Sequence, residues 1–141
     1  MVADIVRDAG AESILDYGCG KGTFKASFAD LKTRSIIREY DPAIPGKDAP
    51  PASADVVVCT DVLEHIEPEC LEAVLDDLRR LTLKIAVLNI ATRAAAKVLP
   101  DGRNAHLIVE PYTWWLPRLW ERWSIVSFNN LGREFVAVGR P

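Results

Sequence analysis

The sequence predicts a single α/β domain, residues 1–141, built on a doubly wound and mostly parallel sheet. Short apolar runs alternate with stretches of helical periodicity, and this alternation is typical of a parallel sheet with helices on both faces. Two strand-like runs around Asn130-Leu131-Gly132 predict a closing antiparallel hairpin. The chain has 141 residues, of which 49% are hydrophobic, and this composition suits one folded core and excludes a disordered chain.

The first half of the chain supplies three of the predicted strands. Apolar residues at helical spacing predict helices, short apolar runs predict strands, and the four prolines of residues 42–54 exclude a regular element there. The expected elements are a helix over 2–9, a strand over 13–17, a helix over 24–31, a strand over 35–40 that ends at Asp41-Pro42, and a strand over 56–59.

The second half continues the alternation and ends in the hairpin. The expected elements are a helix over 67–81 with Pro68 in its first turn, a strand over 84–90, a helix that Thr113 caps with Pro117 in its first turn, and strands over 124–129 and 134–138. The helix after Thr113 places Trp115, Leu116, Leu119, Trp120 and Trp123 on one broad face. This face fits either a packed helix that covers the sheet or aromatic side chains that stack on a planar substrate.

Charge is divided unevenly along the chain. Residues 1–78 hold 7 Lys and Arg against 16 Asp and Glu, a net −9, whereas residues 79–141 hold 10 against 4, a net +6. The division fits either a solvated surface of both signs or a C-terminal half that faces an anionic ligand.

Cysteine content and hydropathy predict the compartment. Three cysteines without a Cys-x-x-Cys pair indicate neither a disulfide set nor a zinc site, so we predict no metal and a reducing environment. No apolar run is long enough to span a bilayer, and residues 1–10 carry acids where a signal peptide would be apolar. We therefore expect a cytoplasmic protein that does not bind a membrane.

A glycine cluster over residues 16–22 follows the first strand and opens a helix. Glycines there let the backbone approach a ligand closely, and Asp41 ends the next strand, where a carboxylate can bind ribose hydroxyls. A nicotinamide or flavin fingerprint needs its third glycine at the position of Thr23, whereas here Gly22 follows Gly20 by two residues. The spacing therefore disfavours a nicotinamide or flavin dinucleotide.

The pattern Asp-x-Gly-x-Gly-x-Gly of residues 16–22 resembles the first motif of class I S-adenosylmethionine-dependent methyltransferases. Residues 40–42, Tyr-Asp-Pro, look like the second-strand acid of that family, and residues 55–66 are similar to the fourth-strand segment of its small-molecule branch, which often ends in Val-Leu-Glu-His. The match covers most of residues 11–90. It implies a Rossmann-like fold, S-adenosylmethionine as cofactor, and the compact type found in bacteria and phages.

The resemblance also implies roles for individual residues. The glycine loop would hold the methionine end of the cofactor, Asp41 the ribose hydroxyls and Asp48 the adenine, while the end of the fourth strand would lie along the sulfonium. The implied cofactor-binding residues are Asp16, Gly18, Cys19, Gly20, Gly22, Asp41, Asp48, Cys59, Thr60 and Asp61. Cys19 and Cys59 fit either small buried thiols or nucleophiles.

One departure from the family concerns the sheet edge. Members usually have a helix and a third strand after the second-strand acid, but only the 13 residues 42–54 separate Asp41 from Asp55. We therefore expect the third strand to be missing, which leaves six strands in the family order 2-1-4-5-7-6. The second strand then becomes an edge that the proline-rich segment covers or that pairs in a homodimer.

The acceptor side should be built by residues 91–123. The candidate catalytic residues are His106, which fits a general base or a hydrogen-bonded structural histidine, and His65, which lies near the cofactor edge. Arg103 would bind a carboxylate or phosphate in a bidentate fork. The other candidate substrate-binding residues are Glu110, Tyr112 and Trp115.

Together these features predict methyl transfer from S-adenosylmethionine to a small, anionic or planar, nucleotide-like acceptor. The chain lacks both the Pro-Pro-Tyr loop and the Pro-Cys pair that nucleic-acid base methyltransferases carry after this strand, so duplex nucleic acid is disfavoured as a substrate. Two alternatives stay open. The chain could be a non-catalytic cofactor-binding partner subunit, or it could use S-adenosylmethionine for another reaction on the same fold.

Overall fold

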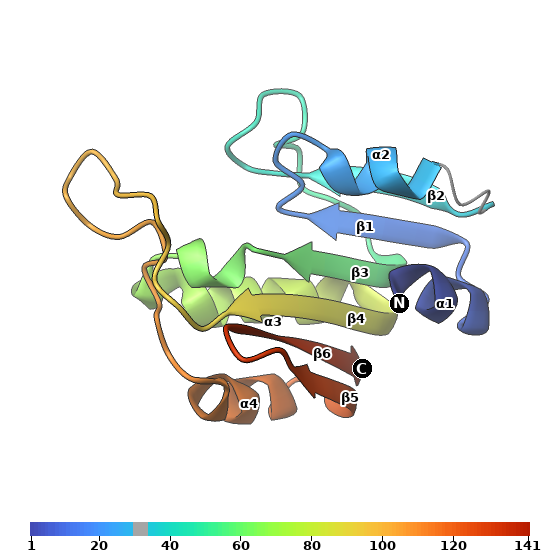
Figure 1. Ribbon diagram of the computed structural model, residues 1–141. Helices are drawn as coiled ribbons and strands as arrows, with labels where there is room; N and C mark the ends of the chain where they lie inside the picture. Colours follow the sequence, from blue (N-terminus) through green and yellow to red (C-terminus); the bar gives the residue numbers. More distant parts are fainter. Residues whose placement is uncertain (30–33) are drawn as a thin grey trace.

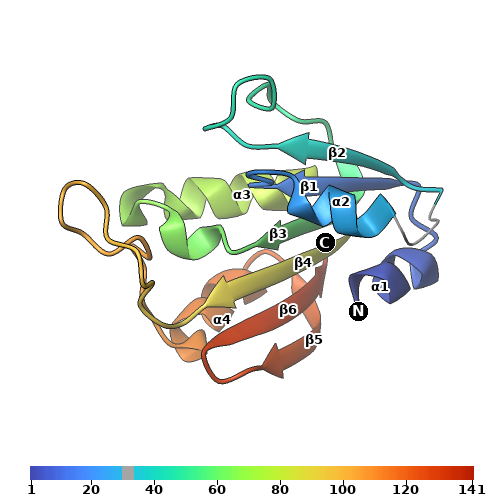
Figure 2. The ribbon, with the colours of Figure 1, turned by 45° about the horizontal axis from the view of Figure 1, so that its top comes forward.

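The computed structural model describes residues 1–29 and 34–141 and shows one six-stranded sheet with helices on both faces (Figures 1 and 2). The strands run in the order β2-β1-β3-β4-β6-β5. They are β1 (Ser13–Tyr17), β2 (Ile36–Tyr40), β3 (Ala54–Thr60), β4 (Thr82–Ala91), β5 (Ser124–Asn130) and β6 (Glu134–Arg140). The strands β2, β1, β3 and β4 are parallel, while β6 is antiparallel to both β4 and β5. The predicted fold and strand order are confirmed.

The helices divide between the two faces of the sheet. They are α1 (Val2–Asp8), α2 (Thr23–Ala29), α3 (Leu71–Leu81) and α4 (Tyr112–Trp120), with short 3-10 turns η1 (Leu63–His65) and η2 (Pro68–Cys70) before α3. Val6 of α1 and Phe28 of α2 pack with Ile14 on one face, whereas the residues of α3 and α4 pack on the other. The longest of the described helices has 11 residues, well short of a membrane crossing. Part of the helix predicted over 24–31 lies outside the described residues.

The predicted start and the predicted buried face of helix α4 were partly wrong. The helix begins after Pro111 rather than Thr113, so Pro117 lies in its interior and not in its first turn. Trp115 and Trp123 are in the core, as a packed covering helix requires, but Trp120 is 59% exposed. Five apolar residues within nine positions spread too far around a helix for all of them to face the sheet.

The segment between β2 and β3 contains turns but neither a helix nor a strand, as its prolines predicted. Its hydrogen bonds are local: the Asp41 amide donates to Lys47 O, and the Lys47 amide donates to Ile44 O. Strand β2 is therefore an edge of the sheet, and Ile36 on it is 64% exposed. Arg38 donates to Ser53 O as the segment returns toward β3. Pairing of this edge in a homodimer stays a prediction.

Candidate functional site

A cavity of about 330 Å³ opens at the carboxyl ends of the parallel strands. Gly18 after β1, Asp41 after β2 and Asp61 after β3 all line it. This is the end of a doubly wound sheet at which ligands bind. The other residues of the wall are Tyr17, Pro42, Ala43, Val62, His65, Ile66 and Val74. A larger groove of about 680 Å³ lies between α1 and strands β4–β6, at Ile5, Lys84 and Arg140, and holds none of the predicted site residues.

The glycine loop is drawn tightly onto its neighbours. The backbone amides of Gly18 and Cys19 both donate to Tyr40 O, at 2.7 and 3.1 Å, which fixes the loop against the end of β2. Gly18 has φ +78°, and a Cβ there would lie 2.4 Å from Val62 Cγ2. Both the conformation and the contact require glycine at this position.

Asp41 joins the loop to the cavity. One carboxylate oxygen accepts a hydrogen bond from the Gly20 amide at 2.9 Å, and the other accepts one from the Ala43 amide at 2.9 Å. A carboxylate has about four acceptor positions, so about two remain for a ligand. Asp41 therefore both shapes the glycine loop and offers its free lone pairs to the cavity it lines.

Asp61 holds an uncommon backbone conformation at the end of β3. Its φ is +54°, the only positive value at a described residue other than glycine. Aspartate tolerates this left-handed region better than most residues, and such strain concentrates at functional sites. The Asp61 amide donates to Asn89 O of β4, so the turn is tied to the neighbouring strand while its side chain faces the cavity.

A second group of polar side chains lies at the end of the strands. Glu64 is completely buried; its Oε1 accepts a hydrogen bond from the Ala91 amide, its Oε2 has no partner, and burial raises its pKa. His65 Nδ1 lies 2.7 Å from Ala105 O, and His106 Nδ1 lies 2.6 Å from Arg93 O. The two imidazole rings are 4.7 Å apart and nearly perpendicular. The predicted catalytic histidines are thus brought together, beside the cofactor cavity that His65 lines.

With this geometry in view, the comparisons are decisive for the family. A family model described as a methyltransferase domain matches residues 3–139. The chain belongs to the methyltransferase domain family. No curated protein matches it in sequence. The prediction that the chain is a methyltransferase is therefore confirmed.

Solved structures similar to this methyltransferase share its fold at low identity. The 1,6-didemethyltoxoflavin-N1-methyltransferase of Burkholderia thailandensis, with bound 1,6-didemethyltoxoflavin and S-adenosylhomocysteine, has a TM-score of 0.69 at 17% identity over 98% of this chain and 75% of that one. The magnesium protoporphyrin IX methyltransferase of Synechocystis, with bound SAH, has a TM-score of 0.71 at 16% sequence identity, and the match covers 99% of this chain and 79% of that one. An O-methyltransferase family protein of Burkholderia thailandensis has a TM-score of 0.63 at 16% sequence identity, and the match covers 99% of this chain and 55% of that one. The methyltransferase therefore spans only about half to four fifths of these chains.

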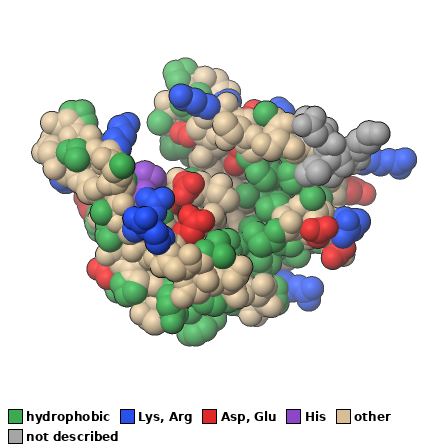
Figure 3. Space-filling view, in the orientation of Figure 1, with side chains coloured by type: hydrophobic (Ala, Val, Ile, Leu, Met, Phe, Trp, Pro, Cys, Tyr) green, Lys and Arg blue, Asp and Glu red, His purple; other side chains and the backbone are tan. Residues whose placement is uncertain are grey.

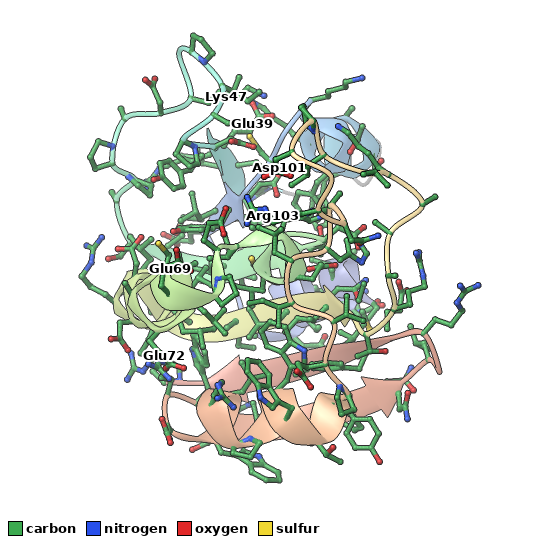
Figure 4. All side chains as sticks on the ribbon, turned by 90° about the vertical axis from the view of Figure 1, so that its left-hand side faces the viewer. Glu39, Lys47, Glu69, Glu72, Asp101 and Arg103 are labelled. Carbon is green, nitrogen blue, oxygen red and sulfur yellow. The ribbon has the colours of Figure 1, made fainter. Side chains whose placement is uncertain are left out.

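Asp16 and Cys19 do not line the cavity of the methyltransferase. Asp16 is 3% exposed, and burial together with the Glu39 carboxylate raises its pKa to about 6. Lys47, labelled with Glu39 in Figure 4, donates to the Glu39 carboxylate at 3.1 Å and to Gly20 O at 3.3 Å. Burial also raises the pKa of the Cys19 thiol, which fits a small buried thiol rather than a nucleophile. Through the bond from Lys47 to Gly20 O, this group supports the glycine loop without lining the cavity.

Three further candidates lie elsewhere than expected. Cys59 is 1% exposed in the core and does not line the cavity, and burial raises its pKa, which favours the small buried thiol of the two interpretations. Asp48 accepts a hydrogen bond from the Gly46 amide and shapes a turn. It does not line the cavity, whereas Ala43 of the same segment does. Thr60 is half-buried at the end of β3 and does not line the cavity.

The acceptor-side candidates separate into two places. Arg103 stands on the loop of residues 92–111 that projects beyond the strand ends, and it donates to both Glu67 carboxylate oxygens, at 2.8 and 2.9 Å, as well as to Asp101 (Figure 4). Trp115 is wholly buried in the core, and Tyr112 packs on Phe128 over the hairpin. Those two aromatic residues cannot stack on an acceptor at the cavity. Glu110 is half-buried at the end of the projecting loop.

Several positive side chains of the second half pair with acids of the first half. Arg122 contacts Glu72 at 2.8 Å and Asp76 at 2.7 Å, and Lys84 lies 3.4 Å from Asp55. With Arg103 on Glu67, these pairs join residues after 78 to acids before it. The uneven charge of the sequence therefore serves in part to connect the two halves of the fold, and it does not form one cationic face for a ligand.

Sequence reasoning missed several residues that build the site. Glu64 received no role, because a glutamate between Leu63 and His65, with Asp61 and Glu67 nearby, gives no local signal that its side chain is buried. The apolar wall formed by Ile66 and Val74 had no local signal, because both residues look like ordinary core positions.

Proposed function

We propose that the chain transfers the methyl group of S-adenosylmethionine, bound in the 330 Å³ cavity, to a small-molecule acceptor that enters beneath the loop of residues 92–111. The observation that carries the proposal is the convergence of Gly18, Asp41 and Asp61, from three separate strands, on one cavity at the carboxyl end of the sheet. The volume falls within the range of small-molecule sites.

The lining suggests how the cofactor lies. The free lone pairs of Asp41 suit the two ribose hydroxyls, and the apolar side chains of Ile66 and Val74 suit the adenine ring. The methionine end then extends along the glycine loop, where Gly18 lets the backbone come close. This arrangement directs the sulfonium toward Asp61 and the histidines.

The reaction asks little of the protein beyond alignment. The acceptor atom attacks the methyl carbon as the carbon–sulfur bond breaks, which yields S-adenosylhomocysteine and the methylated acceptor, and an O–H or N–H acceptor releases one proton. Holding the two reactants in line and excluding water supplies most of the acceleration. The proton is released at His65 and His106, the titratable pair beside the cavity.

The acceptor is therefore a small molecule with a hydroxyl or amine group that faces the histidine pair. Because Arg103 is engaged by Glu67 and Asp101, an anionic group on the acceptor has to displace these carboxylates or use other cations of the loop. Arg93 and Lys97, both exposed on the same loop, are the candidates.

The experiment is an acceptor screen that follows release of S-adenosylhomocysteine by the purified chain. Hydroxylated and aminated planar compounds, with and without a carboxylate or phosphate, form the test set. His106→Gln should lower turnover by about 10²–10⁴-fold and leave cofactor affinity nearly unchanged. Gly20→Val should abolish cofactor binding, because a branched side chain strains the backbone at φ +48° and blocks its close approach to the cofactor, whereas a Cβ at this position meets no protein atom within 4 Å. Tight binding of NADH by the wild type would contradict the proposal.

A further inference from the structure

Both histidines of the chain lie in one cluster with a buried carboxylate. The sequence contains 2 histidines, and one ring nitrogen of each, together with a carboxylate oxygen of Glu64, lies within 4.8 Å of the other two atoms. Glu64 and His65 belong to η1, whereas His106 comes from the loop of residues 92–111. Figure 3 shows histidine atoms reaching the surface on the side from which this loop projects, next to acidic side chains.

Backbone carbonyls orient both imidazole rings. The Nδ1 atoms of His65 and His106 lie within hydrogen-bond distance of Ala105 O and Arg93 O. A carbonyl oxygen can only accept, so each Nδ1 carries the hydrogen, and each neutral ring keeps a lone pair on Nε2. This is the arrangement in which metal-binding histidines are held, with one nitrogen fixed by a carbonyl and the other free for the metal.

The Glu64 carboxylate is a second, independent observation that points to a ligand. Its side chain is completely buried, Oε1 is satisfied by the Ala91 amide, and Oε2 has no hydrogen-bond partner. A buried carboxylate oxygen without a partner is costly unless a proton or a positive ion compensates it. The protein donors around Glu64 leave that position to a bound ion.

We propose that Glu64, His65 and His106 bind a divalent transition-metal ion beside the cofactor cavity. Two histidines and one carboxylate form a donor set for Zn²⁺, Fe²⁺, Co²⁺ or Mn²⁺ that leaves coordination positions open. Donors at about 2.1 Å from an ion stand at most about 4.2 Å apart, close to the limit of 4.8 Å within which the three donor atoms lie.

The place of this site gives the ion a role, which rests on the proposed function. His65 also lines the cofactor cavity, so an open coordination position faces the route of the acceptor. An acceptor oxygen or nitrogen bound there is held in line with the methyl group, and the ion lowers the pKa of its proton. With the ion bound, the histidines would act as ligands in place of the role of base that they have without it, and the proton of the metal-bound acceptor would pass to solvent water.

A competing cluster is less suitable. Asp16, Cys19 and Glu39 also bring three donor atoms within 4.8 Å of one another. The Lys47 ammonium already lies 3.1 Å from Glu39 and occupies the position of a cation there. This cluster serves as the internal control for the location of a bound ion.

The test measures metal binding directly on the untagged, chelator-stripped chain. Calorimetry with Zn²⁺ and Mn²⁺, and the visible absorption of added Co²⁺, should show one ion per chain. His65→Gln, His106→Gln and Glu64→Gln should each weaken binding at least tenfold, because each removes one donor and retains the shape of the side chain. Cys19→Ser, in the competing cluster, should bind as the wild type does.

Binding of S-adenosylhomocysteine is measured on every variant. If it is retained, the variants are folded and the cofactor site is intact, so loss of metal binding reports on the donors alone. The proposal is overturned if the wild type shows no saturable binding, if binding survives in the His65→Gln/His106→Gln double variant, or if it is lost in Cys19→Ser. Metal binding by a chain that does not bind S-adenosylhomocysteine would instead contradict the proposed function.

Discussion

Replacement of Asp41 tests the cofactor site most directly. Its carboxylate uses two acceptor positions on the Gly20 and Ala43 amides, which leaves about two for the ribose diol. Asp41→Ala removes all of these. Hydrogen bonds to a charged group contribute about 1.5–3 kcal/mol. The loss of the diol interaction, about 2–3 kcal/mol, corresponds to about 30–150-fold weaker binding of S-adenosylhomocysteine.

The assay is isothermal calorimetry with S-adenosylhomocysteine, accompanied by thermal denaturation to confirm folding. Asp48→Ala is the matched control, because Asp48 is an acid of the same segment that only caps the Gly46 amide. The control should change the dissociation constant by less than about twofold. Unchanged affinity in Asp41→Ala, or an equal loss in Asp48→Ala, would refute the assignment of the ribose site.

Three further outcomes are expected. Gly18→Ala should lower the melting temperature clearly more than Gly46→Ala. Both positions have positive φ, but only a Cβ at Gly18 would collide with Val62. Equal losses of melting temperature in thermal denaturation would contradict the close contact. The pKa of Asp16 is raised from 3.8 to about 6, so the folded state favours its protonated form. The free energy of unfolding of the wild type, relative to Asp16→Asn, should therefore fall by up to about 3 kcal/mol as pH rises from about 4 to about 6. Urea denaturation of both proteins across this range measures the change. A wild type that gains stability relative to Asp16→Asn as pH rises would contradict the prediction. Finally, a thiol reagent should modify Cys70 rapidly in the native protein and the two buried cysteines only after denaturation.

Much of the fold was predictable because its signals are local. Apolar runs marked the strands, and the 13 residues between Asp41 and Asp55 were too few and too rich in proline for the usual helix and strand, so the reduced sheet followed from length alone. The glycine loop was predictable for the same reason, since Gly18 needs a conformation that other residues avoid.

The site was less predictable because side-chain direction and burial depend on neighbours distant in sequence. Asp16 shares a face of β1 with Ile14, which turns its carboxylate away from the cavity. Cys59 and Trp115 belong to one core cluster with residues of α3, β4 and β6, and these neighbours are distant in sequence from at least one of the two. The pairing of His65 with His106 depends on the fold of a loop without regular structure, and no spacing in the sequence encodes it.

The short turn-rich segment after β2 also affects how the protein moves. Its backbone–backbone hydrogen bonds close small rings within residues 41–47, and side-chain bonds from Lys47 to Glu39 and from Arg38 to Ser53 O connect it to β2. Such a segment opens at a lower free energy than the sheet beside it. Amide hydrogen exchange should therefore be fast there in the free protein and slow once a ligand rests on Pro42 and Ala43, while β3 and β4 exchange slowly in both states. The short segment that stands in place of an edge strand thus forms one wall of the cavity, and we expect the bound molecule to order this wall.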